Sequence, residues 1–243
     1  MTGQLLVVLG AGTDVGKTHL ACSILLWASS NTLPLNSYKP VESGPRDAPI
    51  QTDAMRLANA TVFHVKPPPT LHFSAPLAPA IAASLEGVQV PTEAITATIA
   101  KLRAKAHLLL ELPGGAFSPF DGHQSNAQYL KTLPNPVILL VLKNQLGVLS
   151  DATAYTEALR GLGLAPAMIV LNAPSSPDES TPRNPHDLKP LLPGIPVVSI
   201  PRGSPKRLQH ALPDAWLHAL LGSSSDEAPT LERDIAPRQI SRK

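Results

Sequence analysis

An apolar run that opens into a glycine-rich turn constrains this chain more than any other feature. Leu5 to Leu9 has the composition of a buried strand, and the turn beginning at Gly10 ends in Gly16-Lys17-Thr18. Such a turn directs backbone N–H groups at phosphate oxygens, places a lysine beside the β- and γ-phosphates and offers a hydroxyl to magnesium. Because the apolar stretch after Thr18 has the composition of a buried helix, we expect a P-loop that binds a nucleoside triphosphate.

The turn also carries an unusual carboxylate. Ala11 stands where the common motif has its first glycine, and Asp14 lies inside the loop. A carboxylate beside phosphates repels them unless a cation lies between, so Asp14 predicts a second, cationic ligand nearby. The alternative is that Asp14 caps the following helix.

Composition narrows the class of protein. With 243 residues, of which 43% are apolar, the chain can bury one substantial core. The formal charge of +2 and the aromatic content of 4% give no sign of a nucleic-acid-binding surface. We expect no membrane span, because no apolar run reaches about 18 residues. The start of the chain has no secretory pattern and Cys22 is the single cysteine, so we expect a cytoplasmic protein.

Short apolar runs alternate with helical patterns along the chain. This alternation predicts an α/β fold: a P-loop NTPase-type parallel sheet flanked by helices, in a single domain over residues 1–221. We expect residues 222–243 to form a disordered tail, because they are polar and lack apolar periodicity. The expected strands are Leu5–Leu9, Leu35–Tyr38, His107–Glu111, Val137–Leu142, Ala167–Asn172 and Val197–Ile200. The expected helices are Thr52–Asn59, Thr92–Lys105, Ser125–Leu133, Ser150–Leu162 and Pro213–Leu221.

Polar side chains follow the expected strands where each one ends. Lys39, Glu111, Lys143 and Asn172 all fall at such positions. In open parallel sheets, ligands bind beyond the carboxyl ends of the strands. These four residues are therefore expected at one rim of the sheet, together with the P-loop.

Two carboxylates could complete a magnesium site at this rim. Asp53 begins an expected helix, and Glu111 ends a buried strand just before the Gly114-Gly115 turn. With the Thr18 hydroxyl, they suit a hard ion that takes one or two carboxylates along with phosphate oxygens. Taken singly, Asp53 could instead be a helix cap. Glu111 is costly to bury without a partner, which favours a functional role.

Several segments together resemble the dethiobiotin synthetase family of P-loop enzymes. They are Gly10–Thr18, Tyr38–Gly44, Glu111–Gly115, Pro136–Gly147 and Thr156–Asn172, and the resemblance covers most of residues 4–200. It implies a homodimeric enzyme that converts 7,8-diaminononanoate, CO2 and ATP to dethiobiotin, ADP and phosphate. From composition and the lack of a long apolar run, we expect no nucleic-acid or membrane partner.

The resemblance assigns roles to individual residues. It implies catalytic roles for Lys17, Lys39, Thr13 and Ser43. It implies nucleotide binding by Gly12, Thr13, Asp14, Val15, Gly16, Lys17 and Thr18, with Asn172 on the adenine, and a magnesium site of Thr18, Asp53 and Glu111. On local grounds alone, Asn172 could simply end its strand.

The chain departs from the family pattern at Pro113, Ala80, Ser150 and Asp151. The resemblance places Ser150 and Asp151 in the segment that binds the substrate carboxylate across the dimer. These departures leave open a paralogous P-loop ligase that acts on a different amine. A further alternative, from a related P-loop group, is a nucleotide-dependent switch protein without catalytic activity.

Overall fold

A six-stranded, fully parallel sheet forms the centre of the molecule. The computed structural model describes residues 2–45, 51–61 and 70–222. The strand order is β2-β5-β1-β6-β7-β8, which places the P-loop strand between two neighbours in the middle of the sheet. The strands are β1 (Leu5–Gly10), β2 (Leu35–Tyr38), β5 (His107–Glu111), β6 (Pro136–Lys143), β7 (Met168–Asn172) and β8 (Val197–Ile200). The expected α/β fold with a parallel sheet is confirmed.

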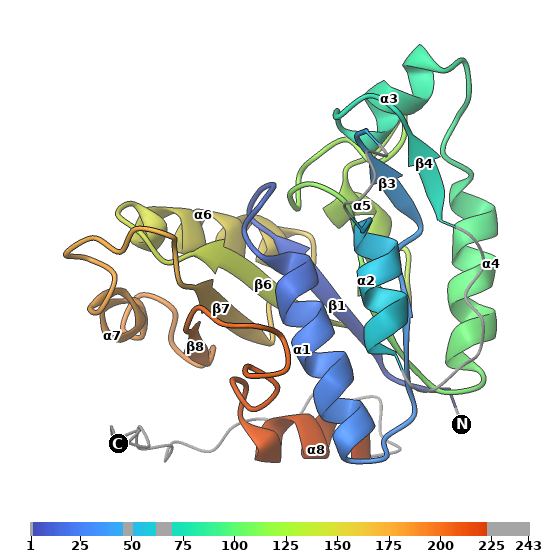
Figure 1. The fold of residues 1–243 in the computed structure, drawn as a ribbon. Coiled ribbons are helices and arrows are strands. Elements are labelled where there is room, and N and C mark those ends of the chain that lie inside the picture. Colours follow the sequence, from blue (N-terminus) through green and yellow to red (C-terminus); the bar gives the residue numbers. More distant parts are fainter. Residues whose placement is uncertain (1, 46–50, 62–69, 223–243) are drawn as a thin grey trace.

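Helices cover both faces of the sheet (Figure 1). Alternate residues of β1 explain this arrangement, because Leu5 and Val7 pack into one apolar core and Leu6 and Val8 into the other. The first core is closed by α4 (Thr92–Arg103), α5 (Asn126–Lys131) and α6 (Val148–Gly161). The second is closed by α1 (Lys17–Ser30), α2 (Asp53–Ala60) and α8 (Asp214–Gly222), and it contains Cys22.

Four short elements are absent from the sequence-based assignment. A separate two-stranded parallel sheet pairs β3 (Val41–Ser43) with β4 (Leu71–Phe73). The short helices α3 (Pro79–Leu85) and α7 (Asn184–Leu188) each carry a proline near their start. Three-residue strands and helices of five to seven residues are too short to produce a visible periodicity. The two-stranded sheet matters for function, since it carries the residues after Lys39 into the site.

Helix starts differ from expectation at two functional segments. The helix expected from Ser150 begins at Val148, with Gly147 as its N-cap. Ser150 and Asp151, expected as the first residues of this helix, therefore lie two residues further into its first turn. For α2, the N-cap is Thr52, whose side chain accepts a hydrogen bond from the Met55 N–H at 3.3 Å. The alternative of Asp53 as the cap is thus wrong.

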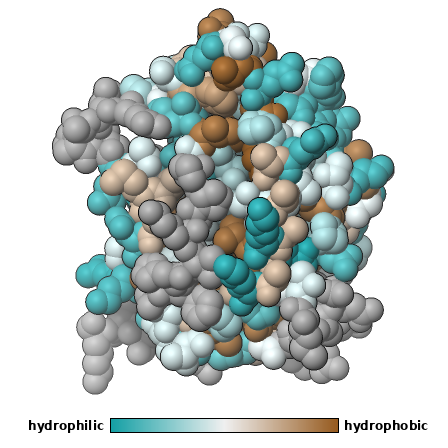
Figure 2. Space-filling view, turned by 90° about the vertical axis from the view of Figure 1, so that its right-hand side faces the viewer, coloured by the Kyte–Doolittle hydropathy of each residue, from teal (hydrophilic) through white to brown (hydrophobic). Residues whose placement is uncertain are grey.

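The surface beside α3 and α4 is mixed in character. Figure 2 views the molecule from this side and shows hydrophilic and hydrophobic residues interspersed. Ile81 and Leu85 of α3 are among the exposed hydrophobic side chains. Within the described ranges, no helix has the length and apolar character needed to cross a bilayer. Helix α8 ends at Gly222, and the rest of the expected tail, residues 223–243, lies outside the described residues.

Candidate active site

Hydrogen bonds to neighbouring segments hold the start of the P-loop in place before α1 begins. Ala11 N–H donates to the Val141 carbonyl at 3.0 Å, and Ala116 N–H donates to the Gly10 carbonyl at 2.8 Å. The Tyr155 hydroxyl of α6 donates to the Ala11 carbonyl. The loop thus starts from a fixed position between β5 and β6.

Gly16 caps α1 in a left-handed conformation with φ of 95°. A Cβ atom at Gly16 would lie 1.8 Å from the Nδ2 atom of Asn172, so both conformation and space require glycine there. The alternative of Asp14 as the helix cap is therefore wrong. Asp14 itself has φ of 54° and lines the cavity described below.

Lys17 is buried and points back along the loop. Its Nζ atom donates to the Gly12 carbonyl at 3.0 Å. Burial lowers the pKa of Lys17 by disfavouring the charged form, although the carboxylates of Glu111 and Asp53 act in the opposite direction. The Asp14 carboxylate also acts to raise the pKa of Lys17. Lys17 of the same loop is therefore one cation near Asp14.

Lys39, Asp53, Glu111 and Thr18 form one compact network. The Lys39 Nζ atom lies 2.6 Å from Asp53 Oδ2 and 2.7 Å from Glu111 Oε1. The Thr18 hydroxyl donates to the same Glu111 oxygen at 2.7 Å. Glu111 is fully buried, and the Lys39 side chain is 5% exposed. The three residues expected to hold magnesium therefore converge, with the Lys39 ammonium among them.

The ion pairs in this network favour the charged forms of Lys39 and Asp53. Burial alone opposes the charge of Lys39, but the carboxylates of Glu111 and Asp53 outweigh it and raise its pKa. Burial would likewise raise the pKa of Asp53, yet its contacts with Lys39 lower it. The folded state thus keeps both Lys39 and Asp53 ionised.

The donor set fits a magnesium ion bound together with phosphate. Glu111 Oε2 is buried and has no hydrogen-bond partner among the described residues, so one carboxylate oxygen remains for a cation. In the same part of the chain, no group of three or more His, Cys, Asp and Glu side chains could hold a metal ion. Two carboxylates and a hydroxyl suit Mg²⁺ when phosphate oxygens and water supply the other ligands.

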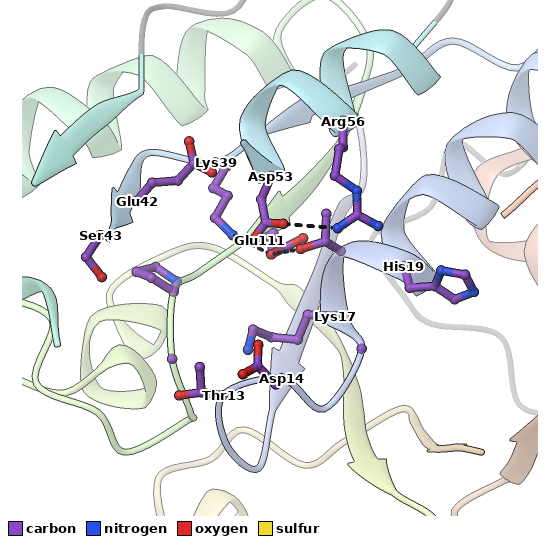
Figure 3. Close-up of a pocket in the computed structure, with 14 residues that line it drawn as sticks. Thr13, Asp14, Lys17, His19, Lys39, Glu42, Ser43, Asp53, Arg56 and Glu111 are labelled. Atoms are coloured by element: carbon purple, nitrogen blue, oxygen red, sulfur yellow. Dashed lines mark hydrogen bonds and ion pairs between the residues drawn. The ribbon is translucent and has the colours of Figure 1, made fainter. Parts of the chain in front are cut away.

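These groups surround a cavity of about 360 Å³. Figure 3 shows Lys39 and Asp53 on one side and the P-loop residues Thr13, Asp14 and Lys17 on the other. Ser43 lines the cavity from the end of β3, and its hydroxyl donates to the Leu77 carbonyl at 2.7 Å. The lining residues are Thr13, Asp14, Gly16, Lys17, Thr18, His19, Lys39, Glu42, Ser43, Asp53, Arg56, Glu111, Pro113 and Gly114.

Two further hollows adjoin the P-loop. Asn172 and Arg202 line one of them together with His19, which also lines the main cavity. The Asn172 side chain donates to the Val15 carbonyl at 3.1 Å, so Asn172 contacts the P-loop as well as ending β7. The other hollow is lined by Gly12, Val15, Lys143 and Asp151 among others. Lys143 is thus at the rim, but it is exposed and lines a different hollow from Lys39 and Glu111.

Of the four residues that depart from the family pattern, Pro113 and Asp151 line hollows described above. Pro113 is buried in the lining of the main cavity, and Asp151 lines the hollow beside Lys143. Ser150 is exposed in the first turn of α6. Ala80 lies in α3, where its N–H donates to the Pro119 carbonyl at 3.4 Å.

Two charged residues of the cavity were missed in the sequence. Arg56 lies one helical turn after Asp53, and its Nη1 atom is 3.3 Å from Asp53 Oδ1. The i,i+3 spacing on the expected helix was a usable signal, since such residues share one helix face. Glu42 accepts a hydrogen bond from Ala54 N–H at 3.1 Å and thereby fixes the start of α2 next to the site. Its signal was weak, because β3 was not recognised.

A P-loop between β1 and α1, followed by a rim of lysines and carboxylates, defines this molecule as a P-loop NTPase-type α/β protein. A family model described as an AAA domain matches residues 4–204. The chain is 35% identical to the ATP-dependent dethiobiotin synthetase BioD of a Caulobacter species over 210 residues, covering 82% of this chain and 88% of the relative. It belongs to the dethiobiotin synthetase family.

Other comparisons agree with this placement. The same-named protein of an Anaeromyxobacter species is 34% identical, over 81% of this chain and 89% of the relative. Since these relatives are ATP-dependent synthetases, the expected ligase class is confirmed for the family. Among solved structures, the septum site-determining protein MinD complexed with Mg-ADP, from Pyrococcus horikoshii OT3, matches with a TM-score of 0.52 and 15% identity. This match covers 83% of this chain and 82% of that one, and it confirms the fold.

Proposed function

We propose that this chain forms dethiobiotin from 7,8-diaminononanoate, CO2 and ATP, and releases ADP and phosphate. One observation carries the proposal. The P-loop residues Lys17 and Thr18 share a single cavity with a second lysine, Lys39, and with the carboxylates of Asp53 and Glu111. A reaction that joins a carbamate to the γ-phosphate of ATP needs this set of charges in one place. Family membership supports the same reaction.

The P-loop binds the phosphates of ATP in this proposal. The backbone N–H groups from Gly12 to Thr18 face the phosphate oxygens, and Lys17 neutralises charge at the γ-phosphate. Lys17 leaves the Gly12 carbonyl to make that contact, and its low exposure strengthens the resulting charge pairing.

Lys39, Thr13 and Ser43 act on the amine and the carbamate. One substrate amine adds to CO2 and loses a proton, which forms the N–C bond of a carbamate. A carbamate oxygen then attacks the γ-phosphorus, and the bond to ADP breaks. Lys39 stabilises the negative oxygens in this step, while Thr13 and Ser43 orient the diamine by hydrogen bonds. The second amine attacks the carbamoyl carbon and closes the ring as phosphate leaves.

Magnesium, when bound, would neutralise the β- and γ-phosphate oxygens. Thr18, Asp53 and Glu111 are the residues that would hold it. The buried Oε2 atom of Glu111 supports this assignment.

Two further carboxylates of the cavity have roles in this proposal. Asp14 attracts the protonated form of the diamine into the cavity. Glu42 holds the start of α2 in place by accepting a hydrogen bond from Ala54 N–H.

The adenine end and the oligomeric state complete the proposal. Asn172 hydrogen-bonds the adenine through its side-chain amide, next to the P-loop carbonyl that it already contacts. We further propose a homodimer that acts in the cytoplasm, with its partner subunit near the start of α6.

A paralogous ligase for a different amine is the second candidate. Pro113 in the cavity lining favours it, because proline replaces a residue with an N–H group beside the substrate. Asp151 near the start of α6 also opposes binding of a carboxylate there.

The test is to incubate the purified protein with ATP, Mg²⁺, bicarbonate and 7,8-diaminononanoate. Dethiobiotin is measured by mass spectrometry and phosphate release is measured in parallel. Both products in equal amounts are expected. Diamines of other chain lengths are compared in the same assay. Turnover of another diamine alone would favour the paralogue, and binding of ATP without any turnover would favour the switch protein.

A further inference from the structure

Arg56 reaches the active-site cavity from α2. Its guanidinium lines the cavity, and its Nη1 atom lies 3.3 Å from Asp53 Oδ1. Figure 3 shows Arg56 extending from α2 toward Asp53, with its guanidinium on the side of His19. It lies across the cavity from Thr13 and Asp14 of the P-loop.

The contact with Asp53 does not account for an arginine here. Its two side chains are 38% and 39% exposed, and ion pairs that exposed contribute little to stability. A guanidinium group has five N–H donors in a planar fork that matches phosphate oxygens. Among the described residues, Arg56 forms an ion pair with Asp53 alone. The ion pair therefore uses only part of the binding capacity of Arg56, which also lines the cavity.

Arg56 lines the main cavity together with His19, which also lines the hollow that contains Asn172. A nucleotide with its phosphates on the P-loop and its base near Asn172 would extend from the main cavity past His19 into that hollow. Its phosphate end would therefore share the main cavity with Arg56.

The difference in burial and ion pairing between Lys39 and Arg56 also favours contact between Arg56 and a ligand. Lys39 is 5% exposed and is held by two carboxylates, whereas the Arg56 side chain is 38% exposed. Arg56 can therefore turn from Asp53 toward a ligand at small cost. It is the most exposed of the three cations that line the cavity, Lys17, Lys39 and Arg56.

We propose that Arg56 binds the phosphate chain of the nucleotide from the side opposite the P-loop. This inference rests on the proposed nucleotide binding. Arg56 is then a second clamp on ADP and ATP, independent of magnesium. A role limited to orienting Asp53 would act only through the metal.

The experiment measures ADP and ATP affinity by isothermal titration calorimetry, once with EDTA and once with Mg²⁺. The variants are Arg56→Gln and Arg56→Lys. Arg160→Gln is the matched control, because Arg160 is 36% exposed and forms an i,i+3 pair with Glu157 on α6, away from the cavity lining. Thermal unfolding verifies that each variant is folded.

We expect Arg56→Gln to weaken ADP affinity about tenfold in both EDTA and Mg²⁺, the size of one lost charge-assisted hydrogen bond. Arg56→Lys should fall between it and the wild type, and Arg160→Gln should match the wild type. Equal affinity of Arg56→Gln and wild type overturns the inference and leaves the proposed function intact. A loss seen only with Mg²⁺ also overturns it, since Arg56 then acts through Asp53. A wild-type protein that binds neither nucleotide overturns both.

Discussion

Lys39 and Glu111 are 72 positions apart in the sequence, yet the Lys39 Nζ atom lies 2.7 Å from Glu111 Oε1. Strand order explains the contact, because β2 and β5 are hydrogen-bonded neighbours and each residue stands just after or at the end of its strand. Glu111 is completely buried, and the Lys39 ammonium is a positively charged partner directly beside it. The lysine proposed for catalysis and a carboxylate proposed for magnesium are therefore coupled.

Removing this charge should destabilise the fold. Lys39→Met leaves Glu111 buried without a cation, which should lower the free energy of unfolding by about 3 kcal/mol. Urea unfolding measures the change. Lys101→Met, an exposed lysine on α4, is the control and should differ little from the wild type. Equal losses in both variants would contradict a special role for the Lys39 pair.

The same Lys39→Met variant should bind a divalent metal more tightly when nucleotide is absent. The ammonium group contacts Asp53 Oδ2 and Glu111 Oε1, so its positive charge repels a cation held by the same two carboxylates. Electron paramagnetic resonance with Mn²⁺ counts free and bound metal. An unchanged Mn²⁺ affinity would show that ammonium and metal do not compete there.

Lys17→Gln should abolish turnover while leaving the fold in place. The variant removes the charge proposed to stabilise the γ-phosphate, and loss of one such group costs on the order of a hundredfold or more in kcat. Phosphate release with the full set of substrates measures the effect. A rate near that of the wild type would remove the P-loop mechanism from consideration.

Gly115→Ala should raise the KM for ATP. A Cβ atom at Gly115 would lie 3.0 Å from the Ala11 carbonyl oxygen and 3.2 Å from Gly12 Cα, so the P-loop must shift. We expect an increase on the order of tenfold, because small displacements of binding groups are costly. Gly122→Ala is the matched control, since nothing lies within 4 Å of its added Cβ. Similar kinetics for the two variants would show that the close approach at Ala11 has no effect.

Acid should weaken the wild type more than an Asp53→Asn variant. The pKa of Asp53 is lowered from its ordinary value of 3.8, where contacts with Lys39 outweigh the opposing effect of burial. A carboxyl group with a lowered folded-state pKa stabilises the fold above its ordinary pKa. That contribution is lost as the pH falls from 3.8 through the lowered value.

Urea midpoints measured from about pH 5 to about pH 2 test this dependence. Asp178, whose pKa is lowered to about 2 mainly by hydrogen bonds from Ser180 and Leu146, titrates in both proteins. The difference between wild type and variant therefore isolates Asp53. Parallel curves would mean that Lys39 does not stabilise the ionised Asp53.

The sequence predicted the centre of the sheet well because the central strands are buried on both faces. The expected strands Leu5–Leu9, His107–Glu111 and Val137–Leu142 fall within β1, β5 and β6, since short apolar runs of this kind suit a strand between two layers of helices. Lys39 and Glu111 could be placed at one rim from topology alone. Their direct contact could not, because it depends on the strand order, which leaves no local mark in the sequence.

Local competition between neighbouring residues explains other differences. Asp53 was a reasonable cap for α2, but Thr52 precedes it and makes the capping bond. Asp14 was a reasonable cap for α1, but the left-handed turn at Gly16 intervenes. Arg56 was missed because its i,i+3 spacing from Asp53 indicates a shared helix face but does not tell whether that face lines a cavity.

The hydrogen bonds at Gly10 and Ala11 should reduce the conformational entropy that the P-loop loses when a ligand binds. Backbone bonds from Ala11 to Val141 and from Ala116 to Gly10, with the Tyr155 hydroxyl on Ala11, restrict the start of the loop before any ligand arrives. A phosphate chain that binds there does not have to order this segment first. More of the intrinsic interaction energy therefore remains as affinity, and association should proceed in one fast step.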